Sequence, residues 1–189
     1  DFFTSEEDWY VKYSRGPEFY TYDSLWDMTS NRTEIQTTLV SGNGVYYKNG
    51  NMTISSGDLP GDFSSDTFTQ VLFVNGDLTI ETDLDINNNS ALLIVVKGNV
   101  NIAKTVAKIE SAIFAEGDIS TAYDIVEGDS TETLYLYGTF SANKFIFQRT
   151  LQGTNNNDAA SEEFYYDAKY VTKISDYLGT NAVKWLRSD

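Results

Sequence analysis

The pattern that decides this fold reads Leu72-Phe73-Val74-Asn75-Gly76-Asp77-Leu78-Thr79-Ile80: an apolar run, a glycine, then alternating small polar and apolar residues. It recurs around Gly50, Gly98, Gly117 and Gly138, so that successive glycines lie 26, 22, 19 and 21 residues apart. A near-constant period in this range is typical of solenoid proteins. Each unit is too small to bury an apolar face alone, so we predict that the units stack around one continuous core.

The aligned copies also separate by chemistry, position by position. Two residues after glycine the side chain is apolar: Met52, Leu78, Val100, Ile119 and Phe140. Three residues after glycine it is polar: Thr53, Thr79, Asn101, Ser120 and Ser141. This alternation is that of a strand with one buried and one exposed face. The first copy departs from it at Lys48, which we interpret as a bulge or a shifted register in an edge rung.

The glycine column predicts turns between strands. Such turns often need a positive φ, which glycine adopts freely, and the neighbouring Asn and Asp residues tolerate it as well. A repeat of this length fits about three short strands of about five residues each. We therefore predict an all-β protein, a single-stranded parallel β-helix (β-solenoid) with about five rungs. An antiparallel two-sheet sandwich is the alternative, since it also uses short, regularly spaced strands.

Three segments follow from this pattern. Residues 1–40 are aromatic and carry no clear repeat, and we expect them to cap the first rungs, because a solenoid end exposes apolar side chains. Residues 41–150 hold the repeats, and residues 151–189 form a loop and a packing or capping segment. In the last segment a set of apolar residues has helical spacing and predicts a helix packed on the solenoid, with an extended tail as the alternative. The set is Phe164, Ala168, Val171, Ile174 and Leu178.

Composition limits the functions open to this chain. It has neither Cys nor His, so it lacks disulfides, the usual general base and the commonest metal ligand. Its formal charge is −15, which opposes binding to nucleic acid and to anionic membranes. No apolar stretch is long enough to insert into a membrane. The chain begins at Asp1, and we expect it to be a processed product or a fragment.

Several segments together resemble a known family. They are Val71–Ile80, Ile94–Val100, Gly117–Ile119, Phe145–Arg149, Asn155–Asn157 and Phe164–Asp167. In this order they resemble the β-helical C-terminal module of large, uncharacterised surface proteins of candidate-phyla bacteria, over most of residues 40–189. The resemblance implies an exported β-helical module without known catalytic activity. The chain departs from the family at Ala159–Phe164, where a Pro-containing segment is usual. A looser similarity links it to bactofilins, which are β-helical and polymerise end to end.

Two candidate ligand sites can be predicted from the residues. Glu81, Asp83 and Asp85 alternate, which would place three carboxylates on one strand face, and Ca²⁺ prefers such oxygen ligands. Exposed acids kept for solubility are the simpler explanation. Trp9, Tyr10 and Trp26 could stack on the sugar rings of a glycan, although aromatic residues near a solenoid end more often cap the core.

These observations lead to two hypotheses of different classes. The first is an extracellular or cell-surface structural or adhesive module that acts by stacking and surface display and is not an enzyme. Its expected partners are other surface proteins, further copies of itself bound through the solenoid ends, or glycans, and no cofactor is expected unless calcium binds. The alternative is a carbohydrate-binding or carbohydrate-active β-helix, similar to a lyase or glycosidase, that uses surface acids with or without calcium.

Overall fold

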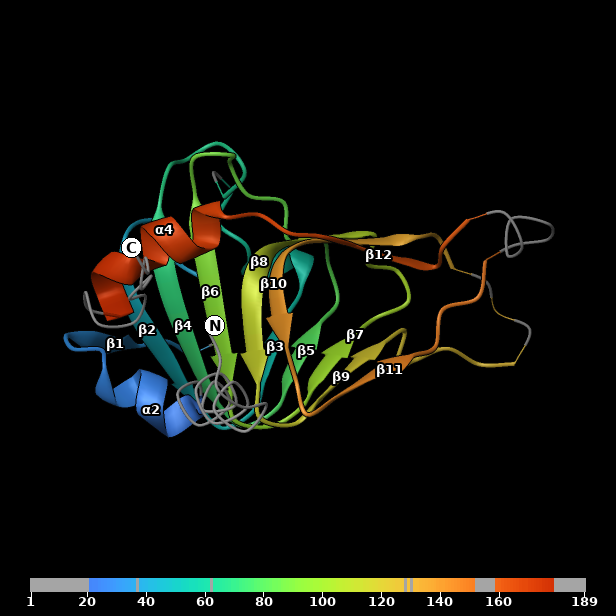
Figure 1. Cartoon of the computed structure of the whole chain (residues 1–189), viewed down its shortest axis with the longest axis horizontal. Coiled ribbons are helices and arrows are strands. Elements are labelled where there is room, and N and C mark those ends of the chain that lie inside the picture. The colour runs from blue at the N-terminus through green and yellow to red at the C-terminus, as the bar shows by residue number, and fades with distance from the viewer. Residues whose placement is uncertain are drawn as a thin grey trace, which may run out of the picture.

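The chain folds as a parallel β-solenoid, as its sequence predicts. The computed structural model describes residues 21–36, 38–61, 63–127, 129, 131–151 and 159–178. From β2 to β12, successive strands alternate between two parallel sheets, and within each sheet a strand pairs with the equivalent strands of the neighbouring rungs (Figure 1). Within the described residues, no helix has the length and hydropathy needed to cross a membrane.

The first sheet, called the long sheet here, has seven strands and the second, short sheet has five. The long sheet contains, in spatial order, β1 (Arg32–Glu34), β2 (Gly44–Asn49), β4 (Thr69–Asn75), β6 (Ala91–Val96), β8 (Lys108–Ala115), β10 (Leu134–Ser141) and β12 (Glu162–Tyr165). The short sheet contains β3 (Met52–Ile54), β5 (Leu78–Ile80), β7 (Val100–Ile102), β9 (Asp118–Thr121) and β11 (Lys144–Phe147). Two α-helices, α2 (Tyr22–Asp27) and α4 (Lys169–Leu178), and one short 3₁₀ helix, η2 (Ser56–Asp58), complete the described elements.

A third side closes the later rungs. The strand β12 pairs with β10 through Leu134–Tyr137, the first half of that strand. On the same side Leu84 forms an isolated parallel bridge with Ile109, in the first half of β8. The expected three strands per rung are therefore present where β8, β10 and β12 stack, whereas loops supply most of this side in the earlier rungs.

The glycine column has a different cause from the one expected. Among the glycines at the corners between the two sheets, Gly50 has a positive φ (82°), whereas Gly76, Gly98 and Gly117 do not. These three lie directly against the corner of the preceding rung. A Cβ atom would come within 2.5 Å of the Gly50 carbonyl carbon at Gly76, and within 2.7 Å of the Gly98 oxygen at Gly117. Close stacking of corners, rather than left-handed backbone, therefore requires glycine here.

The fifth copy of the pattern is out of register with the others, so its predicted alignment was wrong. Gly138 lies inside β10 opposite Ser111, and the last corner falls at Asn143, whose N–H donates to the Gly117 oxygen. In the short sheet Phe145 stands opposite Ile119, the place predicted for Phe140. This shift could not be predicted from the glycine pattern, because the last corner contains no glycine.

The predicted irregularity at Lys48 is also absent. The strand β2 pairs with β4 in one continuous register, and Lys48 stands directly opposite Val74. In the long sheet this rung is not at the edge, because β1 precedes it. In the short sheet its strand β3 is the edge strand, as predicted. The long sheet therefore extends beyond the predicted repeat zone at both ends, through β1 before residue 41 and β12 after residue 150.

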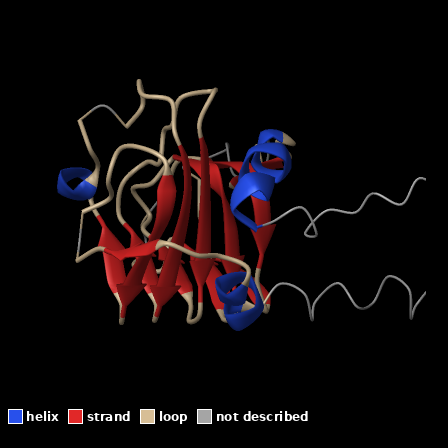
Figure 2. Cartoon of the chain, turned by 90° about the vertical axis from the view of Figure 1, so that its left-hand side faces the viewer, coloured by secondary structure: helices blue, strands red, loops and turns tan. Residues whose placement is uncertain are grey.

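Burial differs between the two sheets because helices cover one of them. In the short sheet the strands β3, β5 and β7 bury their first and third residues and expose the middle one at least partly, as the alternation predicts. The strand β6 is buried at all six positions, on both faces. The helices α2 and α4 lie beside the long sheet near opposite ends of its strands, and α4 contacts β4 and β6 (Figure 2).

The cap predicted for residues 1–40 and the helix predicted for residues 151–189 are each found in part. The segment α2 packs on the outer face of the long sheet, where Trp26 and Tyr22 meet Phe73 edge to face at 5.2 and 5.5 Å between ring centroids. It covers a side of the solenoid rather than an end. The predicted C-terminal helix is confirmed as α4, but Phe164, at the start of its predicted pattern, belongs to β12.

Candidate functional site

The three carboxylates predicted to bind calcium have separate roles. The Asp83 side chain accepts hydrogen bonds from the backbone N–H groups of Ala107 and Lys108, at 2.7 and 3.0 Å. Asp85 pairs with the Lys108 ammonium group at 3.0 Å, and Glu81 is exposed. Over the described residues, no three acidic side chains gather into a group that could hold a metal ion. The predicted calcium site therefore has no geometry to support it.

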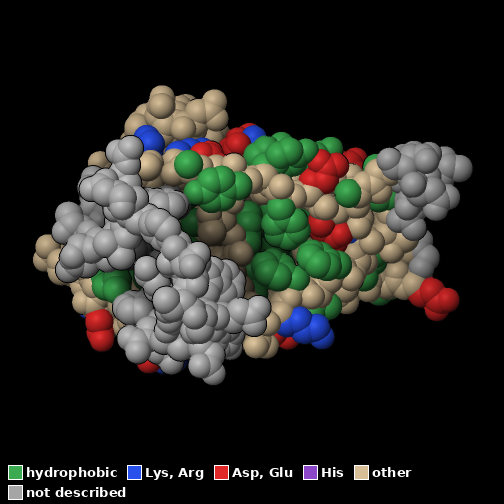
Figure 3. All heavy atoms as spheres, viewed as in Figure 1, with side chains coloured by type: hydrophobic (Ala, Val, Ile, Leu, Met, Phe, Trp, Pro, Cys, Tyr) green, Lys and Arg blue, Asp and Glu red, His purple; other side chains and the backbone are tan. Residues whose placement is uncertain are grey.

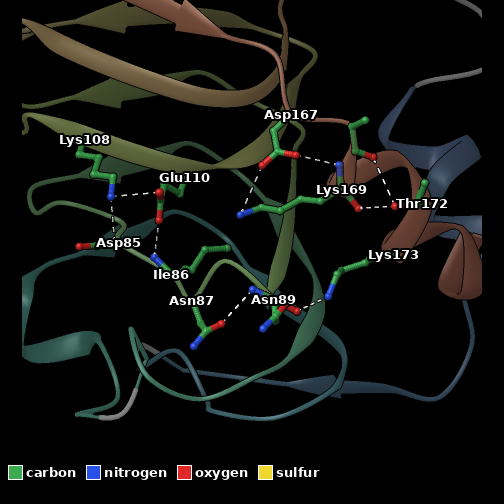
Figure 4. A network of polar contacts seen from close by, with 11 residues as sticks. Asp85, Ile86, Asn87, Asn89, Lys108, Glu110, Asp167, Lys169, Thr172 and Lys173 are labelled. Carbon is green, nitrogen blue, oxygen red and sulfur yellow. Dashed lines mark hydrogen bonds and ion pairs between the residues drawn. The ribbon is translucent and has the colours of Figure 1, made fainter.

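The acids of this region instead fasten a loop to the third side. Lys108 lies between Asp85 and Glu110, with its Nζ atom 3.0 Å from a carboxylate oxygen of each (Figure 4). The other Glu110 oxygen accepts a hydrogen bond from the Ile86 N–H at 2.9 Å. Burial lowers the pKa of Lys108, but the hydrogen bonds to Glu110 and Asp85 outweigh it and raise the pKa above its ordinary value. The network holds the loop after β5 in place, which is a structural role.

Of the three aromatic residues predicted to bind a glycan, the structure describes Trp26, and its ring is not free. Trp9 and Tyr10 lie outside the described residues. The Trp26 ring stacks on Tyr22 at 5.9 Å, and the Arg32 guanidinium lies over it at 3.9 Å from its centroid. Since neighbours occupy this ring, Trp26 packs α2 against the sheet, which agrees with the simpler explanation given above.

The acidic column at the corners is likewise structural. Asp77 and Asp118 stand in one column with Asn99 between them, and each side chain accepts a hydrogen bond from the next rung. Each of these carboxylates therefore serves to position the next rung.

The two ends of the solenoid differ in how well they are covered. At the first strand of the short sheet, β3, the inward side chains of Met52 and Ile54 are 3% and 0% exposed. At the last strand, β11, Phe147 is 56% exposed, and on the neighbouring edge strand β12 Phe164 is 47% exposed. Among the described residues, therefore, the core is closed at its N-terminal end and open at the end formed by β10, β11 and β12, called the open rung here.

Four phenylalanines fill the open rung. Phe164 meets the other three edge to face, with centroid distances of 5.8 Å to Phe140, 5.7 Å to Phe145 and 6.2 Å to Phe147. Apolar side chains gather in the middle of this face of the molecule (Figure 3). Edge-to-face packing is a favourable aromatic geometry, so the cluster is an ordered surface and not a loose collection of rings.

Beside this cluster runs a column of tyrosines on the outer face of the third side. Tyr165 stacks on Tyr137 at 4.8 Å, and Tyr135 lies 6.4 Å from both rings. Tyr165 belongs to the edge strand and is 43% exposed. Its hydroxyl donates to Glu163, and this hydrogen bond raises the pKa of Tyr165 to about 12.

The open rung also offers unpaired backbone. In the described part of the chain, no strand pairs with the outer edge of β12 or of β11. Such an edge presents a row of N–H and C=O groups that can pair with another strand. This site was not predicted, because Phe140 was assigned to the column that Phe145 occupies and Phe164 was assigned to a helix. The sequence features that could have indicated this site are two aromatic runs, Lys144–Phe147 and Phe164–Tyr166.

These features define the class of the protein as a parallel β-solenoid with one covered side and one open end. Comparison with family models, curated proteins and solved structures gave no match to this chain. Its function must therefore be argued from its own residues.

Proposed function

We propose that this chain is a structural and adhesive β-solenoid module, displayed at a cell surface or in an extracellular assembly, and that it catalyses no reaction. One observation carries the proposal: the rungs stack on apolar side chains from β3 to β9, while the corner acids serve the stacking itself. Leu78, Val100 and Ile119 stand in adjacent rungs and are 0–1% exposed. A continuous ladder of this kind makes a stiff unit.

The surface chemistry supports display outside the cell. The chain carries 28 acidic and 13 basic residues, so copies held close together at a surface repel one another. Strong net charge also keeps a protein soluble when it is concentrated. Adhesion would use the open rung, because its exposed phenylalanines and free strand edges are the features of a protein-binding surface.

Two measurements test this function. The first is antibody labelling of intact cells of the source organism, with permeabilised cells as the control. We expect equal labelling in both, and a signal confined to permeabilised cells would contradict surface display. The second is incubation of the purified chain with acidic and neutral polysaccharides, with and without calcium. Release of reducing or unsaturated ends above the rate of a heat-denatured control would overturn the claim that the module is not an enzyme.

A further inference from the structure

We infer that the free edge of β12 binds an extended segment of another protein as a parallel strand, and that this segment carries a basic residue followed by two bulky apolar or aromatic residues. The inference rests on the proposed function, since it names the kind of partner that the adhesive end recognises. It follows from the backbone direction, the side-chain alternation and the charge of β12.

The direction of the added strand follows from the parallel strand pairing of the solenoid. All pairings in the two sheets are parallel, and β12 continues the stack from β10. A parallel added strand would repeat the same step and keep each side chain over its equivalent in β12. Addition of a strand to an exposed edge is a common mode of peptide recognition, in which the backbone supplies affinity and alternate side chains supply specificity.

The inward side of the added strand must be apolar at one position. Phe164 stands opposite Leu136, on the side of β12 that faces the core, and the end of the core above it is open. A Phe or Leu stacked over Phe164 would extend the aromatic cluster and remove both side chains from water. The other inward position faces Glu162, whose carboxylate already accepts hydrogen bonds from Thr121 and Ser161 at 2.5 Å each. A small hydroxyl residue suits that position.

The outer side of the strand must be basic and then aromatic. Glu163 and Tyr165 stand opposite Tyr135 and Tyr137 on the outer face. A Lys or Arg over Glu163 would form a cross-strand ion pair, and an aromatic ring over Tyr165 would add the next member of the stacked column. The expected segment therefore reads Thr or Ser, Lys or Arg, Phe or Leu, and Tyr.

The same charges argue against a second copy of this chain as the occupant. Two copies at −15 each repel, and the edge strand β12 itself carries two glutamates, Glu162 and Glu163, which favour a basic partner. The negative charge of the chain attracts a basic segment instead, and the association rate of that segment should fall as the salt concentration rises. Charge complementarity thus selects a basic partner strand over self-association.

The test uses a fluorescein-labelled octapeptide, Ser-Gly-Thr-Lys-Phe-Tyr-Ser-Gly, titrated with the full chain and followed by fluorescence anisotropy. We expect a dissociation constant of roughly 10–100 µM at low salt, typical of a short strand added to an edge. The same peptide with Glu in place of Lys should bind at least tenfold more weakly. In the E163K variant this preference should reverse. The matched control is E34K, which places the same charge change on the edge strand β1 at the other end and should leave the preference unchanged.

A second variant checks the apolar contact. F164D should abolish binding. Because the Phe164 ring packs on Phe140, Phe145 and Phe147, the unfolding midpoint of this variant should fall, and binding is measured at a temperature where its circular dichroism spectrum matches that of the wild type. If the wild-type chain fails to bind the peptide at 1 mM, or if E163K and F164D bind it as well as the wild type does, the inference is wrong. Sedimentation showing a dimer that F164D dissociates would identify a second copy as the occupant and overturn it too. None of these results depends on surface labelling or polysaccharide turnover, so the proposed function can stand when this inference fails.

Discussion

The Asp77 side chain accepts a hydrogen bond from the backbone N–H of Asn99, one rung further along, with an N–O distance of 2.7 Å. The same relationship joins Asn51 to Asp77 and Asn99 to Asp118, each at 2.9 Å. The small polar residue after each corner glycine therefore positions the next corner. The column works as a ladder of side-chain acceptors parallel to the backbone ladders of the two sheets.

Removing one acceptor from this ladder should destabilise the solenoid modestly. In D77A the Asn99 N–H loses its partner, but the corner is exposed and water can replace the carboxylate. We expect a loss of about 1 kcal/mol in the free energy of unfolding. Urea denaturation measures it. D77N is the matched control, because the amide keeps an acceptor oxygen and should stay within about 0.5 kcal/mol of the wild type. Equal losses in both variants would show that the charge, and not the acceptor, stabilises the corner.

The glycines beside this ladder should tolerate no side chain. A Cβ atom at Gly98 would lie 2.8 Å from the Gly76 oxygen and 2.1 Å from the Asp77 carboxylate. G98A must therefore separate two rungs and break the Asp77 hydrogen bond, and we expect it to lower the free energy of unfolding by about 2–4 kcal/mol.

The control for this variant is G57A. Gly57 lies in η2, has no positive φ, and has no atom within 4 Å of a Cβ built on it. Its unfolding midpoint should match that of the wild type or rise slightly, since Ala restricts the unfolded chain. A G98A protein as stable as G57A would refute the explanation of the glycine column by close stacking.

The sequence predicts the fold because inward and outward positions repeat in register wherever a corner contains glycine. Leu78, Val100 and Ile119 could be assigned to one column from spacing alone. The prediction failed at the last rung, where Asn143 forms the corner and a pattern aligned on Gly138 points to the wrong residues. Period alone does not reveal which rung lacks a neighbour, so the open rung needed the three-dimensional structure. The covering of Phe73 by Trp26 was hidden for the same reason, because packing between distant segments leaves no periodic signal.

A buried arginine holds the loops of the third side together. Arg149 is 7% exposed, and its guanidinium donates to the backbone oxygens of Ala103, Val106 and Glu132 at 3.0, 2.6 and 3.1 Å. Burial lowers its pKa below the ordinary arginine value. In R149M these carbonyl groups lose their donor, and we expect unfolding to become easier by about 2–4 kcal/mol. R149K should be nearly as unstable, because an ammonium group cannot reproduce the planar fork.

The control for Arg149 is K144M, which removes an exposed cation on β11 and should change the free energy of unfolding by less than about 0.5 kcal/mol. Guanidinium denaturation of the three variants compares them directly. If R149M and K144M unfolded at the same denaturant concentration, the carbonyl contacts of Arg149 would contribute nothing to stability.

Tyr165, on the edge strand β12, should ionise at a higher pH than an ordinary tyrosine. The hydrogen bond from its hydroxyl to Glu163 raises the pKa of Tyr165 to about 12 in the folded chain, above the value near 10 expected in the unfolded chain. A raised pKa means that the stabilisation is complete below about pH 10 and is lost as the pH rises toward 12. Absorbance at 295 nm follows tyrosine ionisation. The wild type and Y165F should therefore differ by one tyrosine that titrates near pH 12, and in E163Q the same tyrosine should titrate closer to pH 10. Titration of Tyr165 near pH 10 in the wild type would contradict the Glu163 hydrogen bond and weaken the case for an ordered edge at β12.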